Sequence, residues 1–154
     1  MKIVQKTIKN NISFSGISLH SGLDVNVCIK PASPNNGIVF KRVDLKNNNL
    51  VYPNFMNVTN TSLNTTIENE FGVKVSTIEH LMCALFGLGI DNALIEIDNE
   101  EVPILDGSAK VFIDKIISAG IETSEYPIKI IKINKEVNYS EGDRYINIKP
   151  STLS

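Results

Sequence analysis

Two stretches of the chain carry the apolar spacing of an amphipathic helix, and most of the remaining apolar residues follow strand-like patterns. The first stretch, residues 76–86, gathers its apolar side chains on one stripe, namely Ile78, Leu81, Met82 and Leu85. The second begins near Asp106 or Ser108, either of which can act as an N-cap, and ends at Gly120. These patterns predict an α+β fold in which one mostly antiparallel sheet packs on two helices as a two-layer sandwich.

Strand patterns dominate the first half of the chain. Residues 24–30 alternate between apolar and polar side chains, the period-two pattern of a half-buried strand, which ends at Pro31. Residues 34–37, Pro-Asn-Asn-Gly, are a turn signal before the segment 38–43 (IVFKRV), which is rich in β-branched residues, so we expect these two strands to form a hairpin. A further strand, residues 93–97, follows the first helix.

A composition break near residue 125 predicts a domain boundary. After the isoleucine-rich segment 128–133 (IKIIKI), two short strand patterns flank a Glu-Gly-Asp turn and predict a new hairpin. We expect residues 1–124 to form a first domain. Residues 125–154 are then the truncated start of a second, similar domain, because about thirty residues are too few for a core of their own.

The composition argues against several classes of protein. Fifteen Lys and Arg against seventeen Asp and Glu give a net charge of −2 without a basic block, so nucleic acid is not an expected partner. No stretch approaches the roughly 18 apolar residues of a membrane span, and the first residues lack the apolar run of a secretion signal. Cys28 and Cys83 are too few for a disulfide framework, and we expect free thiols in the cytoplasm.

The stretch Ser-Thr-Ile-Glu-His-Leu at residues 76–81 is the richest in chemistry. Its adjacent Glu79 and His80 can supply a general base and an imidazole ligand. An alternative is a capping box, in which Glu79 bonds the amide of the serine that starts the stretch. On the helical wheel His80 lies opposite the apolar stripe, beside Cys83 and Ala84. We therefore expect an exposed face of small residues there, against which something packs.

Four blocks of the sequence resemble, in order and spacing, the signatures of the zinc-dependent UDP-3-O-acyl-N-acetylglucosamine deacetylases of lipid A synthesis. The blocks are residues 16–22 (GISLHSG), 75–81 (VSTIEHL), 84–92 (ALFGLGIDN) and 103–109 (PILDGSA). The resemblance covers essentially the whole chain. Its last thirty or so residues resemble the opening of the family's second domain.

This resemblance implies the hydrolysis of the N-acetyl group of a UDP-linked, 3-O-acylated glucosamine, the committed step towards lipid A. It implies that His80 is a ligand of Zn²⁺ and that Glu79 is the base that takes a proton from the attacking water. It also places three residues at the substrate: Thr61, Leu63 and, as the weakest of them, His20. A histidine in a Gly-flanked turn can equally be a local hydrogen-bonding residue.

The stretch 57–66 is dense in Asn, Thr and Ser, which predicts a polar loop that is a candidate for binding. The sequence departs from the family here. Asn60 stands where the family has an acidic residue, and Asn64 where it has Cys or another small residue, so contacts to the acyl chain are expected to differ. The alternative for Thr61 and Leu63 is a solvated turn.

By the same resemblance, the family's remaining zinc ligands, a His and an Asp, lie in the second domain together with a later catalytic His. The chain has only two histidines, His20 and His80. We therefore expect no deacetylase activity from this chain alone. It is a truncated piece of the enzyme, one half of a deacetylase completed by a separately encoded second half, or a non-catalytic binding or scaffold domain.

Overall fold

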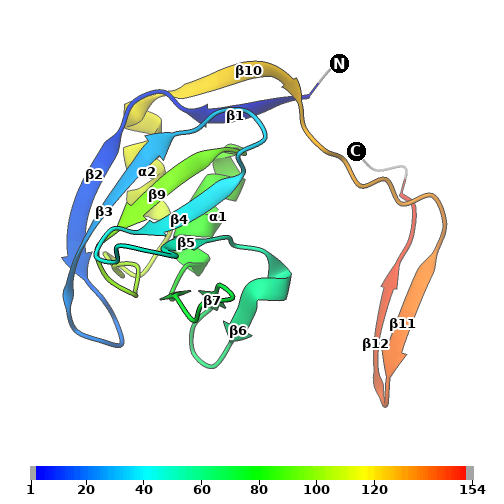
Figure 1. Ribbon diagram of the computed structural model, residues 1–154. Coiled ribbons are helices and arrows are strands. Elements are labelled where there is room, and N and C mark those ends of the chain that lie inside the picture. Colours follow the sequence, from blue (N-terminus) through cyan, green and yellow to red (C-terminus); the bar gives the residue numbers. More distant parts are fainter. Residues whose placement is uncertain (1–2, 152–154) are drawn as a thin grey trace.

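The centre of the computed structural model, which describes residues 3–151, is a five-stranded sheet with the strand order β2-β3-β9-β4-β5 (Figure 1). Its strands are β2 (Ile12–Ile17), β3 (Asp24–Pro31), β4 (Ile38–Arg42), β5 (Leu50–Val51) and β9 (Ala93–Ile97). Neighbouring strands are antiparallel except for β4 and β9, which run parallel. The prediction of a mostly antiparallel sheet is confirmed.

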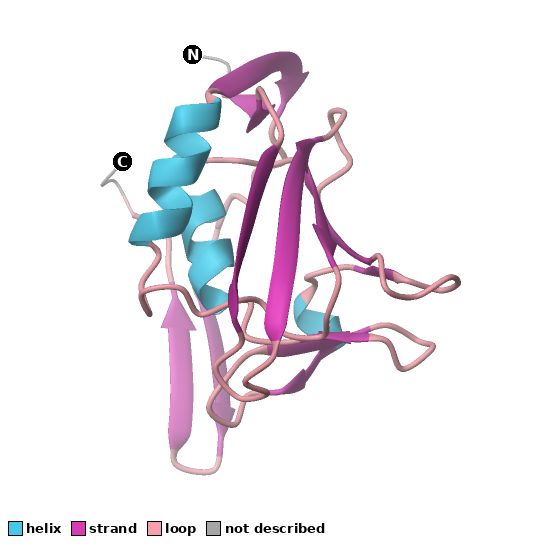
Figure 2. Cartoon of the chain, turned by 90° about the vertical axis from the view of Figure 1, so that its left-hand side faces the viewer, coloured by secondary structure: helices cyan, strands magenta, loops and turns pink. Residues whose placement is uncertain are grey.

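Two helices, α1 (Glu79–Leu88) and α2 (Lys110–Ala119), cover one side of this sheet (Figure 2). The core between the layers is formed by inward residues of β3 and β9 and by the stripes of both helices, including Val27, Ile95, Leu81, Leu85, Phe112 and Ile116. On the opposite side of the sheet, Glu96 on β9 forms ion pairs with Lys30 on β3 and Lys41 on β4. The predicted α+β two-layer sandwich is confirmed.

The predicted hairpin between β3 and β4 is wrong, although Asn35 and Gly37 do form a turn with positive φ. β9 lies between the two strands, antiparallel to β3 and parallel to β4. Its inward residues Ala93 and Ile95 are fully buried, as expected for a central strand of a sheet with a helical layer.

Both helices begin later than the sequence predicts. α2 has Ala109 at its N-cap without a side-chain cap, which corrects the expected N-cap at Asp106 or Ser108. Ser108 still contributes, since its hydroxyl accepts a hydrogen bond from the Lys110 amide at 3.1 Å. α1 ends at Leu88, and Gly89 follows as its C-cap in the left-handed conformation, with a φ of 68°.

Smaller elements complete the fold beside the main sheet. β1 (Val4–Ile8) pairs with β10 (Ile121–Pro127), and a short 3₁₀ helix, η1 (Phe55–Asn57), precedes a second, three-stranded sheet. That sheet contains β6 (Val58–Asn60), β7 (Thr66–Glu68) and β8 (Lys74–Val75), in this order. The loop between β6 and β7 and the residues after β8 form the candidate site described below.

The last described strands, β11 (Val137–Glu141) and β12 (Arg144–Ile148), form the predicted hairpin. All residues of both strands are exposed, and Figure 1 shows the hairpin away from the main sheet. Whether residues 125–154 begin a second domain stays a prediction. Within residues 3–151, neither helix has the length and apolarity needed to cross a membrane.

Candidate active site

Residues 76–80 comprise the turn after β8 and the first two residues of α1, and they link the two sides of the site. The amide of Ser76 donates to the carbonyl of Glu100 at 2.8 Å, and the carbonyl of Ser76 accepts from Val102 at 3.1 Å. The next residue, Thr77, is buried and has a φ of 54°, which is strained for a β-branched side chain. This anchored turn fixes where the first helical residues, Glu79 and His80, are presented.

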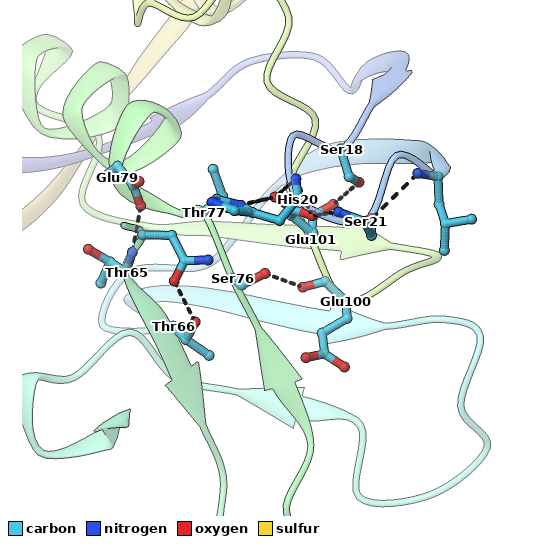
Figure 3. Close-up of polar contacts among 12 residues, drawn as sticks. Ser18, His20, Ser21, Thr65, Thr66, Ser76, Thr77, Glu79, Glu100 and Glu101 are labelled. Carbon is cyan, nitrogen blue, oxygen red and sulfur yellow. Dashed lines mark hydrogen bonds and ion pairs between the residues drawn. The ribbon is translucent and has the colours of Figure 1, made fainter. Parts of the chain in front are cut away.

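Glu79 is half-buried and turns towards the β6–β7 loop (Figure 3). Its Oε2 accepts a hydrogen bond from the amide of Thr65 at 3.0 Å. The alternative prediction, a capping box between Glu79 and Ser76, is therefore wrong. Ile78 is the N-cap and has no side-chain cap, while the Ser76 hydroxyl contacts the Glu100 carbonyl instead. Because α1 begins at Glu79 itself, Glu79 is not at the third helical position that a capping box requires.

The β6–β7 loop is held against the start of α1 at its base. Besides the contact from Thr65 to Glu79, the amide of Ile78 donates to the carbonyl of Thr65 at 3.4 Å. Further out on the loop, Thr61 is exposed, and Leu63 is 89% exposed with a φ of 65°. The structure thus places the loop that carries both predicted substrate residues next to Glu79, with the apolar Leu63 side chain in solvent.

His80 lies half-buried one residue further along α1. Of its small neighbours, Cys83 is exposed as expected, but Ala84 is completely buried, which corrects the prediction that both belong to an exposed face. Ala84 follows Leu81 and Leu85 towards the sheet because the buried stripe is wider than the sequence pattern indicates. His80 is accessible enough to be one metal ligand. Within residues 3–151, however, no three His, Cys, Asp or Glu side chains are grouped as a metal site would require.

His20 lies in the turn between β2 and β3, on the other side of residues 76–80 (Figure 3). Its ring Nδ1 is 2.8 Å from Oε1 of Glu101. The same oxygen accepts a hydrogen bond from the Thr77 hydroxyl at 2.9 Å, and the amides of His20 and Ser21 donate to this carboxylate. The structure therefore joins His20 to the segment that leads to Glu79, through Thr77 and Glu101.

Glu101 was not predicted from the sequence. It is only 3% exposed. Burial by itself would raise its pKa, but hydrogen bonds from the Ser21 and His20 amides, the His20 ring and the Thr77 hydroxyl lower the pKa to about 2. The carboxylate is therefore ionised at neutral pH. Nothing local distinguishes it in the sequence from the exposed Glu100 beside it, since its donors come from distant segments.

Comparison with known proteins agrees with the four sequence blocks. The family model described as UDP-3-O-acyl N-acetylglycosamine deacetylase (LpxC) matches residues 5–154. A UDP-3-O-acyl-N-acetylglucosamine deacetylase of Haemophilus influenzae (strain PittEE) is 46% identical over 149 residues, which cover 96% of this chain and 48% of the relative. A deacetylase of the same name from Wigglesworthia glossinidia brevipalpis is 44% identical over 150 residues, covering 97% and 50%.

The chain thus spans about half the length of the curated relatives that it matches. The match extends over nearly all of this chain, including residues 76–80, His20 and Glu101. On this evidence, the chain belongs to the UDP-3-O-acyl N-acetylglycosamine deacetylase family.

Proposed function

We propose that this chain supplies one side of the active site for the zinc-dependent deacetylation of UDP-3-O-acyl-N-acetylglucosamine, the committed step of lipid A synthesis. The observation that carries the proposal is the placement of Glu79. Its carboxylate is half-buried and oriented by the Thr65 amide instead of capping the helix. Within residues 3–151 only Oε2 is hydrogen-bonded, so Oε1 is available to accept a proton.

In the reaction that we propose, a water oxygen attacks the acetyl carbonyl carbon while Oε1 of Glu79 takes a proton from that water. The bond between this carbon and the sugar nitrogen then breaks. The nitrogen receives the proton that Glu79 took from the water, and acetate and the free amino sugar leave. Zn²⁺, when bound, would polarise the carbonyl and lower the pKa of the water. His80 fits as one of its ligands, and the others would come from outside residues 3–151.

Three residues would contact the substrate. Leu63 presents an exposed apolar side chain, which suits the acyl chain, and Thr61 is an exposed residue of the same loop. His20 lies on the other side of residues 76–80, where its half-exposed ring can hydrogen-bond a polar part of the substrate. A substrate bound across residues 76–80 would therefore meet the loop on one side and His20 on the other.

We further propose that residues 125–154 begin a second domain that carries the remaining ligands. The β11–β12 hairpin supports this, because Val137 lies opposite Ile148 and Tyr139 opposite Ile146, which gives the hairpin one apolar and exposed face. An isolated two-stranded hairpin is at best marginally stable in water, so this face requires a covering segment. We place the protein in the cytoplasm, where the free thiols of Cys28 and Cys83 would stay reduced.

The test is a chimera in which this chain replaces the matching 149 residues of the Haemophilus influenzae relative. Release of the free amino sugar is measured with Zn²⁺ present. We expect Glu79→Gln to lower the rate by at least about 100-fold, the usual contribution of a positioned general base. The matched control is Glu70→Gln, an exposed glutamate of the β7–β8 turn, which should leave the rate unchanged.

Two results separate the alternatives. A folded chimera without deacetylase activity would favour a non-catalytic binding or scaffold domain. Activity that appears when this chain is mixed with a separately produced second half of the relative would favour a split enzyme. A chimera that is active and insensitive to Glu79→Gln would refute the role assigned to Glu79.

A further inference from the structure

We propose that Glu101 is a positioning residue for His20, which holds the imidazole as the Nδ1–H tautomer and leaves Nε2 as the atom available to a substrate. The catalytic meaning of this inference rests on the proposed function, but the tautomer itself does not. A buried carboxylate lies between His20 and the turn that leads to Glu79.

The hydrogen bonds around Glu101 leave it only the role of acceptor. Oε1 receives the Thr77 hydroxyl at 2.9 Å and the His20 amide at 3.0 Å, and Oε2 receives the Ser21 amide at 2.9 Å. An ionised carboxylate has no proton to donate. The 2.8 Å contact between Oε1 and Nδ1 of His20 is therefore a hydrogen bond only if Nδ1 carries the proton.

Ionisation of Glu101 follows from the same contacts. Burial opposes the charge, yet the two amides, the imidazole and the hydroxyl together lower the pKa of Glu101 to about 2. In its neutral form the imidazole of His20 consequently carries its proton on Nδ1 and a lone pair on Nε2. This is the arrangement by which a carboxylate fixes the tautomer and orientation of a functional histidine.

The two ends of this pair differ in their access to solvent. The Glu101 side chain is 5% exposed, whereas the His20 side chain is 37% exposed. Because the Nδ1 edge of the ring faces the buried carboxylate, the opposite edge with Nε2 lies towards the exposed part. Nε2 is then an acceptor for a hydroxyl or N–H group of a substrate bound across residues 76–80.

Glu101 also holds Thr77, which lies in the turn before Glu79. Thr77 has a left-handed backbone conformation that is unfavourable for a β-branched side chain, and its hydroxyl is bonded to Glu101. Glu79 follows two residues later. Glu101 therefore restrains both the imidazole of His20 and the backbone that leads to Glu79. The same buried carboxylate thus positions His20 on one side of the site and Glu79 on the other.

The experiment is ¹⁵N NMR of the imidazole nitrogens of the 154-residue chain at neutral pH, in which protonated and lone-pair nitrogens have well separated shifts. His20 is assigned by comparison with His20→Gln. We expect Nδ1 of His20 to be the protonated nitrogen. A proton on Nε2 in the unsubstituted chain overturns the proposal before any glutamate is changed.

Glu101→Gln then tests the cause. The glutamine offers one acceptor oxygen and a donating NH₂ group where all neighbours are donors, so we expect the Nδ1–H preference to be lost. Glu100→Gln, at the adjacent exposed glutamate, should retain it. Retention of the Nδ1–H tautomer in Glu101→Gln refutes the role of Glu101. If that variant does not fold, Thr77→Val removes one neighbouring donor but not the carboxylate, and should keep the tautomer.

In the active chimera we expect Glu101→Gln to lower kcat/KM by about tenfold or more, by analogy with the groups that orient metal-ligating histidines. Glu100→Gln should leave kcat/KM unchanged. An unchanged kcat/KM in a Glu101→Gln chimera that has lost the tautomer refutes the positioning role in catalysis. Because the NMR experiment needs no substrate, an inactive chimera would count against the proposed function and not against the tautomer.

Discussion

Replacement of Glu101 by Gln should remove an acid-sensitive part of the stability of this fold. The pKa of this carboxyl is lowered from 4.5 to about 2 because hydrogen bonds from the Ser21 and His20 amides, the His20 ring and the Thr77 hydroxyl outweigh the cost of its burial. A difference of that size corresponds to about 3 kcal/mol of stability at neutral pH. Since the folded-state pKa is depressed, the contribution is present above pH 4.5 and is lost as the pH falls towards 2.

The assay is urea unfolding followed by circular dichroism, at pH values from about 7 down to about 3. The quantity of interest is the unfolding free energy of the original chain minus that of Glu101→Gln. We expect this difference to shrink by about 2 kcal/mol between neutral pH and about pH 3, where most of the linkage has been lost.

The difference in unfolding free energy between the original chain and Glu101→Gln reports on Glu101 separately from other acid-sensitive groups. Hydrogen bonds from basic side chains also lower the pKa of Asp44 and of Glu96, but both residues titrate in the two proteins alike and cancel. The exposed Glu100→Gln serves as the matched control and should follow the original chain at every pH. A difference that stays constant with pH would mean that Glu101 is not held ionised by its four donors.

Two further substitutions test the packing that supports the site, and urea unfolding at neutral pH measures both. Leu81→Ala, in the fully buried stripe of α1, should cost about 3 kcal/mol through lost burial and the cavity left behind, and a cost under about 1 kcal/mol would contradict the packing of α1 on the sheet. Asn92→Ala should cost about 2 kcal/mol, because the Gly37 amide loses its acceptor and the Gln5 side chain loses a donor. An unaffected Asn92→Ala variant would show that these groups find other partners.

Local patterns in the sequence were sufficient to predict both helices and the strands of residues 24–30 and 93–97. The stripe Ile78, Leu81 and Leu85 predicts a helix because its spacing depends only on residues within three turns. The pairing of β3 with β4 failed for the opposite reason. A turn signal at residues 34–37 says that the chain reverses, but it does not exclude a strand from residues 93–97 between the two arms. Strand order depends on contacts far apart in the sequence.

In the candidate site, too, local features could be predicted from the sequence and long-range contacts could not. Glu79 and His80 could be chosen as candidates because they are adjacent and lie in one of the four blocks that resemble the family. The hydrogen bond of Glu79 could not be predicted, since its donor is the amide of Thr65, fourteen residues away. The local sequence pattern instead indicated a capping box with Ser76. Glu101 was missed because its role arises only where three distant segments meet, at His20, Thr77 and Glu101 itself.

We propose that Glu79 and His80 have different roles in the reaction, with Glu79 moving the proton and His80 holding the metal. Metal analysis of the purified chimera measures this directly, with bound zinc per chain determined for the parent, Glu79→Gln and His80→Ala. We predict that Glu79→Gln keeps its zinc although it has lost deacetylase activity, and that His80→Ala loses most of its zinc. Full zinc occupancy in His80→Ala would contradict the role of His80 as a ligand of the metal.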